Sequence, residues 1–329
     1  MEFQNIMREI YSGLIGDYYR DRAYLLKNKE TYKSNKFYSQ IEPKINELLK
    51  NMEPVKKKII REETKEEKIK KINSLYDGAI KYFDEKIFEK AKKQMEYIFS
   101  KYKEFFIFDN KCIKLSFADK IEMGLYSAYY KPSREVYLTE VDNSDFYRIY
   151  GKILFELENY NEAIEAFKLS LKWDPVNVDA LINISEVYYH LKQEDAFLKH
   201  IKLALEFATC KEDLAICYKY LGNYYLEKNQ YELSISLYSL SNSIVSNRSK
   251  EEEQKLQDRM KFLQRILGNK YKGKTQSELA LLLKNNKINC GPSKIVVNTL
   301  KNLIKQSAAD NATEIEEYCT DKLIRLLSY

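Results

Sequence analysis

The side chains that most often perform catalysis or bind metals are scarce in this chain. It has two histidines, His190 and His200, which leaves little imidazole for either role. The cysteines are odd in number and scattered, with no two separated by only two residues: they are Cys112, Cys210, Cys217, Cys290 and Cys319. Such spacing fits neither a disulfide framework nor a zinc site. We therefore expect buried free thiols and no metal ion.

Sequence motifs of known catalytic machinery are also missing. The chain has no Gly-rich phosphate loop, no G-x-S-x-G, no H-E-x-x-H and no protein-kinase signature. Aspartate and glutamate are abundant, but they fall on the polar faces of helical patterns, where a carboxylate ordinarily pairs with lysine. We predict that the protein is not an enzyme and uses no cofactor.

Length and composition favour helices as the elements that position these side chains. The chain has 329 residues, of which 44% are hydrophobic, and only 9 are glycine and 5 are proline. So few turn-forming residues disfavour a β-sandwich or barrel, whereas long helices with short connections fit well. The 28 tyrosines also fit, because a tyrosine ring can pack between helices while its hydroxyl reaches water. We predict an all-α fold.

The sequence also bears on where the protein acts. No stretch approaches the roughly 18 apolar residues that would span a bilayer, and the first residues lack the basic and apolar regions of a secretory leader. We therefore expect a soluble, cytoplasmic protein with no membrane partner. The bias towards lysine, asparagine, isoleucine and tyrosine points to a low-GC bacterial source.

A repeated pattern of about 34 residues organises the centre of the chain. Counted from Ser144, the unit 144–177 has Tyr147, Tyr150, Gly151, Leu154, Ala163, Phe167, Ser170 and Pro175 at positions 4, 7, 8, 11, 20, 24, 27 and 32. This unit resembles the tetratricopeptide repeat (TPR), which is a helical hairpin. The small residues Gly151 and Ala163 mark where its two helices approach most closely, and Pro175 stops the second helix.

Three further units keep this pattern to different degrees. Units 178–211 and 215–248 follow in the same register, with three extra residues between them. The segment 72–98 fits as a degenerate hairpin, with Leu75, Ala79, Tyr82 and Ala91 at positions 4, 8, 11 and 20. The resemblance implies an α-α superhelix of stacked hairpins over residues 72–248.

Both ends of the chain and one internal segment fall outside the repeats. Residues 1–71 show helical spacing of apolar residues, and residues 105–142 form an irregular insertion with one helix near 120–130. Over residues 249–329, Ser249 and Thr275 are positioned to cap helices, which we expect to cover the exposed edge of the last repeat. A homo-oligomer formed through the tyrosine-rich N-terminal helices is a further hypothesis.

The resemblance also implies a binding surface, because TPR arrays present the first helix of each hairpin in a groove that binds a peptide or helix of a partner protein. The corresponding residues here are Arg148, Lys152, Phe155, Asn183, Glu186, Tyr189, Lys219 and Asn223. Lys219 and Asn223 match family residues that hold a peptide's terminal carboxylate, although Lys152 departs from that pattern. We expect Arg148 and Lys219 to anchor carboxylates; a purely structural role for each of these residues is the alternative.

One region of the chain is strongly basic. Between Lys261 and Lys305, ten basic residues stand against one acidic residue, Glu278, whereas the whole chain has a net charge of +6. The candidate basic face consists of Lys270, Lys272, Lys274, Lys287 and Lys294. A concentrated positive face attracts nucleic acid or an acidic protein surface, so the alternative function is a peptide-sensing regulator that contacts nucleic acid through residues 261–305. The other interpretation is that these lysines are simply solvated.

Overall fold

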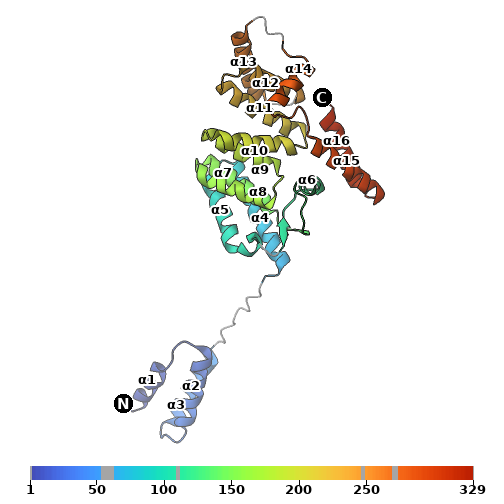
Figure 1. Ribbon diagram of the computed structural model, residues 1–329. Coiled ribbons are helices and arrows are strands. Elements are labelled where there is room, and N and C mark those ends of the chain that lie inside the picture. Colours follow the sequence, from blue (N-terminus) through green and yellow to red (C-terminus); the bar gives the residue numbers. More distant parts are fainter. Residues whose placement is uncertain (1, 53–62, 109–111, 246–248, 269–272, 329) are drawn as a thin grey trace. The chain divides into compact units, whose positions relative to one another are not determined.

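The computed structural model describes residues 2–52, 63–108, 112–245, 249–268 and 273–328. The chain divides into two compact units, Met1–Glu63 and Thr64–Tyr329, each with its own buried core. Among the described residues there are sixteen α-helices and only two strands, of three residues each, so the predicted all-α fold is confirmed. Figure 1 labels these elements.

The N-terminal unit is a small bundle of three helices. They are α1 (Glu2–Ser12), α2 (Tyr18–Thr31) and α3 (Tyr38–Asn51), and their shared core consists of Met7, Ile10, Leu25, Ile41 and Ile45. The buried carboxylate of Asp21 fixes the turn between α1 and α2, because it accepts hydrogen bonds from the backbone N–H groups of Ile15 and Gly16 (2.9 and 2.7 Å).

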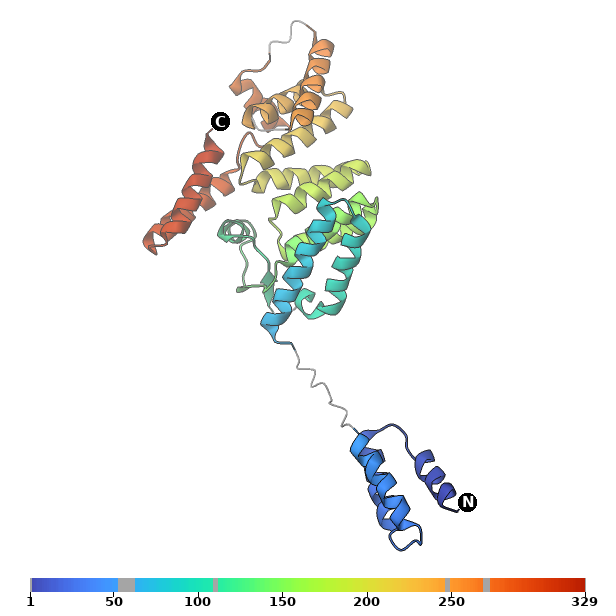
Figure 2. The same ribbon diagram turned by 180° about the vertical axis from the view of Figure 1, so that it is seen from behind.

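Eight helices of the larger unit form four hairpins that stack on one another (Figures 1 and 2). The first helices of the hairpins are α4 (Lys65–Asp84), α7 (Asn143–Glu156), α9 (Val178–His190) and α11 (Lys211–Glu227). The second helices are α5 (Phe88–Lys101), α8 (Tyr160–Trp173), α10 (Glu194–Phe207) and α12 (Tyr231–Ile244). Helix α4 starts ahead of the repeat pattern, because Thr64 and Glu67 form a capping box at its N-terminus.

The same backbone turn joins the two helices in all four hairpins. Its central residue has a positive φ of 55–60° in each case, and these residues are Lys86, Glu158, Lys192 and Asn229. Two backbone N–H groups bond back to the end of the first helix, for example Glu158 N to Phe155 O and Asn159 N to Leu154 O (both 2.9 Å). The hairpin α4–α5, whose sequence fits the repeat least well, therefore has the same turn as the others.

Each hairpin places a small residue of its first helix opposite a larger residue of its second. A Cβ atom at Gly151 would lie 2.6 Å from Cε1 of Phe167, and one at Gly222 would lie 2.7 Å from Cε1 of Tyr238. The other two hairpins hold Ser185 with Ile201 and Ala79 with Met95 at the equivalent positions. An aromatic ring at this site thus goes with glycine, whereas an aliphatic side chain goes with a residue that has a Cβ atom.

The insertion between α5 and α7 is a short β-α-β unit. It contains the 3-10 helix η1 (Lys103–Phe106), strand β1 (Ile113–Leu115), helix α6 (Lys120–Tyr130) and strand β2 (Val136–Leu138). The two strands pair in parallel, with Ile113 opposite Val136. The insertion is attached to the end of α8, because the backbone N–H of Ser116 donates to the carbonyl of Trp173 (2.9 Å).

Four helices follow the last hairpin: α13 (Lys250–Leu267), α14 (Gln276–Asn285), α15 (Lys294–Ala309) and α16 (Thr313–Leu327). Helix α13 packs on α12 through Leu256 and Leu263. The side chains of Ser249 and Thr275 cap α13 and α14. The hairpin α15–α16 packs against α6 and α10, so the C-terminal region and the insertion meet on one side of the array.

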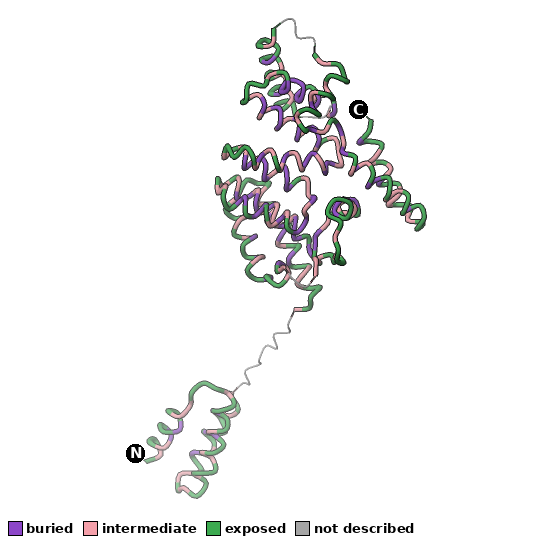
Figure 3. Tube along the Cα trace, viewed as in Figure 1, coloured by how far each residue is buried: buried purple, intermediate pink, exposed green. Residues whose placement is uncertain are grey.

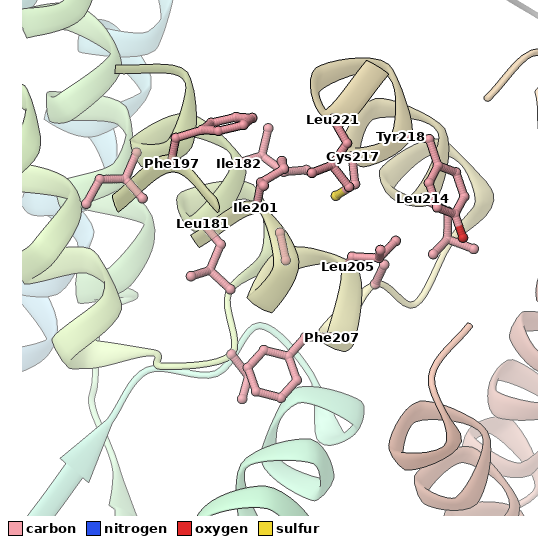
Figure 4. Packing of buried hydrophobic residues seen from close by; sticks show 14 of the residues in the cluster. Leu181, Ile182, Phe197, Ile201, Leu205, Phe207, Leu214, Cys217, Tyr218 and Leu221 are labelled. Atoms are coloured by element: carbon pink, nitrogen blue, oxygen red, sulfur yellow. The ribbon is translucent and has the colours of Figure 1, made fainter. Parts of the chain in front are cut away.

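The main core extends from β1 to α16 (Figure 3). Figure 4 shows its centre, where Leu181, Ile182, Phe197, Ile201, Leu205, Phe207, Leu214, Cys217 and Leu221 pack together. Tyr218 is also fully buried, and its hydroxyl donates to Asn289 O (2.8 Å) and accepts from Gly291 N (2.7 Å). This tyrosine therefore ties the hairpin α11–α12 to the connection between α14 and α15.

Because Phe167 fills the space beside Gly151, the substitution Gly151→Ser should lower the free energy of unfolding by about 1–3 kcal/mol. Adding Phe167→Ile to Gly151→Ser reproduces the pair Ser185 and Ile201 of the hairpin α9–α10. The smaller isoleucine should make the serine at position 151 less destabilising. The double variant should therefore lose less stability than the two single losses together, by at least ~0.5 kcal/mol. Urea denaturation followed by the fluorescence of Trp173, the one tryptophan of the chain, measures all four proteins.

Tyr238 provides the control for this cycle, since it belongs to a different hairpin. The effects of Gly151→Ser and Tyr238→Ile should add. If Gly151→Ser and Phe167→Ile were equally additive, the contact between these two positions would not limit the stability of the hairpin.

Candidate functional site

The first helices of the hairpins lie next to one another and form one continuous surface, which we call the first-helix face. Contacts between side chains link each helix of this face to the next. The hydroxyl of Tyr76 on α4 donates to Asp145 on α7, and the hydroxyl of Tyr189 on α9 donates to Glu227 on α11. Helix α13 continues the face beyond α11, because Arg259 donates to Asn223.

The candidate residues on α7 lie along this face and have neighbours within the protein. The half-buried guanidinium of Arg148 donates to Asp145 Oδ1 (2.9 Å from Nε). The ammonium group of Lys152 lies 5.1 Å from the centre of the Phe83 ring on α4. The Phe155 ring packs edge-on against His190 of α9, with 5.2 Å between ring centres.

The candidate residues on α9 occupy the middle of the face. The side chain of Asn183 is half-buried, and no other group in the described part of the chain is hydrogen-bonded to it. Glu186 interacts with the hydroxyl of Tyr220 on α11, and burial together with this carboxylate raises the pKa of the tyrosine. Tyr189 carries Lys192 over its ring, 4.9 Å from the centre. Asn183 is therefore the best placed of these side chains to bond to a ligand.

Lys219 and Asn223, the pair that resembles a carboxylate clamp, both contact the C-terminal helices. The ammonium group of Lys219 lies 3.6 Å from Glu252 Oε1 on α13. The side-chain oxygen of Asn223 accepts hydrogen bonds from Tyr238 (2.6 Å) and from Arg259. A peptide carboxylate would have to compete with Glu252 for the lysine. Sequence spacing alone gave no signal of this competition, since Glu252 belongs to a helix outside the repeats.

A cleft that sequence reasoning missed opens at the N-terminal ends of α7, α9 and α11. Its volume is about 410 Å³, and α6 forms one wall. Its charged and polar lining residues are Glu122, Asp142, Asp145, Arg148, Asn177, Asp179, Thr209, Cys210 and Asp213. Carboxylates are favourable there because they face the positive ends of three helix dipoles. A signal was available, because Asp145 and Asp179 both occupy position 2 of their repeats.

The cleft holds more negative charge than its single arginine neutralises. Burial raises the pKa of Asp213 to about 6, and the charge of Asp179 contributes. Burial raises the pKa of Glu122, which lines the cleft, and of its neighbour Asp174. Glu122 raises the pKa of Asp174 further, whereas the hydrogen bond with Asp174 lowers that of Glu122, as expected for two groups that share a proton. A cation in the cleft would stabilise the ionised forms of these groups.

The candidate basic face cannot be assembled as one surface from the described residues. Lys270 and Lys272 lie outside the described ranges. The ammonium group of Lys274 pairs with Glu232 Oε2 of α12 (3.0 Å). Lys287 lines a hollow beside α10, and Lys294 is exposed at the start of α15. Lys274 and Lys287 thus have different surroundings.

The described residues contain no group of three or more His, Cys, Asp or Glu side chains arranged to hold a metal ion. Cys217 and Cys319 are buried, whereas Cys290 is exposed, so the expectation of buried thiols is wrong for Cys290, which lies in the connection before α15. Within the described ranges, no helix is both long enough and apolar enough to cross a bilayer.

The raised pKa of Asp213 predicts a pH effect on stability. Between about pH 4, near the ordinary pKa of aspartate, and pH 6, the folded protein holds a proton that the unfolded chain releases. Stability should therefore fall as pH rises through this window. Asp213→Asn, which cannot ionise, should reduce the fall and raise stability at pH 7 by about 1–3 kcal/mol.

Urea denaturation at pH 5 and pH 7, followed by Trp173 fluorescence, tests this. Asp195→Asn on the exposed side of α10 is the matched control and should leave the pH dependence unchanged. An Asp213→Asn variant as pH-dependent as the native protein would contradict the assignment of the effect to Asp213.

Comparison with known proteins identifies the repeat. A family model described as tetratricopeptide repeat matches residues 145–177, which form the hairpin α7–α8 and the link to α9. No curated protein matches the chain. The matched hairpin shares its turn, and its pairing of a small with a large residue, with the three other hairpins. The chain is therefore a helical repeat protein of the tetratricopeptide type.

Proposed function

We propose that this protein is a non-catalytic interaction protein that binds a basic segment of a partner protein on the first-helix face. Tetratricopeptide repeats are protein-interaction modules. The observation that supports the basic character of the partner is the cleft at the ends of α7, α9 and α11, in which five carboxylates surround one arginine.

The charge of the face favours this choice over a carboxylate ligand. Arg148 and Lys219, the two cations that sequence reasoning offered to a carboxylate, already interact with Asp145 and Glu252. A negatively charged terminus would have to displace these partners. A lysine or arginine side chain entering the cleft would instead lie among carboxylates whose ionisation is opposed by burial, and it would make charge-assisted hydrogen bonds with them.

The rest of the face suits an extended segment. Asn183 offers an amide, which can bond to a peptide backbone, and it lies one helical turn after Asp179 of the cleft. Further along, Phe155 and Tyr189 offer half-buried aromatic surface. A basic residue in the cleft followed by apolar residues therefore fits the order of side chains along α9.

The alternative, a regulator that contacts nucleic acid through residues 261–305, has less support. Lys274 already pairs with Glu232, and Lys287 has different neighbours. The charge in this region therefore does not form one described surface to match a phosphate backbone.

Selection of twelve-residue peptides from a random display library against the full-length protein tests the proposal. The enriched peptides should carry lysine or arginine. Asp179 is exposed in the cleft, so Asp179→Lys should fold normally and weaken binding of an enriched peptide by at least about tenfold, through loss of one charge pair and repulsion by the new cation. Fluorescence anisotropy with a labelled peptide measures the affinity.

Glu317→Lys is the matched control, because Glu317 is exposed on α16 and the substitution changes the net charge equally. It should leave the affinity within about twofold. Enrichment of acidic peptides, or equal losses in the two variants, would argue against a basic ligand in the cleft.

A further inference from the structure

A second hollow, separate from the first-helix face, lies between α10, the end of α6 and the connection from α14 to α15. Its volume is about 530 Å³. Three lysines line it: Lys199 and Lys202 from α10, and Lys287 from the connection. Glu206 is its one acidic lining residue, and this carboxylate already accepts a hydrogen bond from the Asn289 amide (2.6 Å). The hollow therefore has a positive excess.

The lysines of this hollow differ from other lysines nearby in having no carboxylate paired with them among the described residues. Lys192 and Lys228 each pair with a carboxylate of the neighbouring hairpin, Glu227 and Glu194 respectively. In the described part of the chain, Lys199, Lys202 and Lys287 form no ion pair with a carboxylate, although they share one hollow. Three like charges that line one hollow and outnumber its single carboxylate repel one another, and a bound anion would reduce that repulsion.

Lys202 lies deepest of the three. Its half-buried ammonium group donates to the backbone carbonyl of Asn286 at the end of α14 (3.0 Å). Burial, and then the charge of Lys287, lowers the pKa of Lys202, which places the two cations near each other. An ammonium group has three donors, so two remain after the bond to Asn286. Lys202 can thus hold α14 in place and still bind a ligand.

The hollow also carries an exposed aromatic ring. Tyr129 of α6 is 44% exposed, and its ring is held edge-on against Phe207 of α10, with 4.9 Å between ring centres. Figure 4 shows the Phe207 ring directed towards α6. A fixed, exposed tyrosine beside clustered cations is the combination that binds single nucleotides of a strand, with the base stacked on the ring and the phosphate on the cations.

We propose that this hollow binds a nucleotide, with its phosphate groups on Lys199, Lys202 and Lys287 and its base on Tyr129. Three converging cations suit a multiply charged phosphate better than a single carboxylate, and the volume falls within the range of small-ligand sites. A free nucleotide and one unit of a single strand share this chemistry. The proposal does not depend on peptide binding, because the hollow is built from a second helix.

Titration of the full-length protein with ATP, with inorganic tripolyphosphate and with a labelled twelve-nucleotide oligothymidylate, at about 50 mM salt, tests the site. Lys287→Ala and Lys202→Ala should each weaken ATP binding by about tenfold. Tyr129→Ala should weaken ATP by about tenfold and leave tripolyphosphate unchanged, since only ATP has a base to stack. Calorimetry gives the affinities, and Trp173 fluorescence reports whether each variant is folded.

Lys261→Ala on α13 removes the same charge from an exposed position outside the hollow and is the control, expected to change affinity less than twofold. Lys287 is exposed, so its variant should fold even if Lys202→Ala does not. Tighter binding of ATP or of the oligonucleotide would identify the source of the nucleotide. Failure of both to bind, equal losses in Lys287→Ala and Lys261→Ala, or displacement of ATP by an oligoglutamate peptide at similar concentration would overturn the proposal.

Discussion

The close approach of the two helices within each hairpin is the constraint on which the larger unit depends. Where a ring fills the interface, as Phe167 and Tyr238 do, the opposing residue is glycine, and a Cβ atom there would collide with it. This contact fixes how each first helix lies on its second helix, and hence how the hairpins stack. This packing of the two helices therefore sets the positions of the first-helix face, the acidic cleft and the lysines of α10.

Local signals in the sequence predicted much of this architecture. Contacts between residues far apart in the sequence could not be predicted in the same way. The cap residues Ser249 and Thr275 were expected to open helices, and they cap α13 and α14. The neighbours of the candidate site residues lie too far away to be read from spacing: Glu252 beside Lys219 comes from a helix outside the repeats, and Lys202 meets the end of α14 only after the chain folds back. The geometry of a hairpin follows from the pattern of residues within about 34 positions. The charge balance of a surface depends instead on which helices, often distant in the sequence, pack together.

The hairpin α9–α10 contributes to two sites, one lined mainly by carboxylates and one lined mainly by lysines. Its first helix contributes Asp179 to the acidic cleft, and its second contributes Lys199 and Lys202 to the basic hollow. The two sites are separate in their lining residues, yet α6 contributes to both, through Glu122 in one and Tyr129 in the other. The β-α-β insertion is therefore more than a link between repeats, because a displacement of α6 would alter both sites together.

The uniform turn of the hairpins has a consequence for how the protein opens. Because each hairpin is closed by local bonds and packs mainly on its neighbours, opening of the array resembles the unzipping of a linear stack from its ends. The hairpin α4–α5 packs mainly on α7 and on η1, whereas α9–α10 contacts α7, α8, α11 and α15. Amide hydrogens of α4 and α5 should therefore exchange with solvent fastest among the repeats, and those of α9 and α10 slowest. The centre of the array then stays folded while the hairpin at its end opens locally.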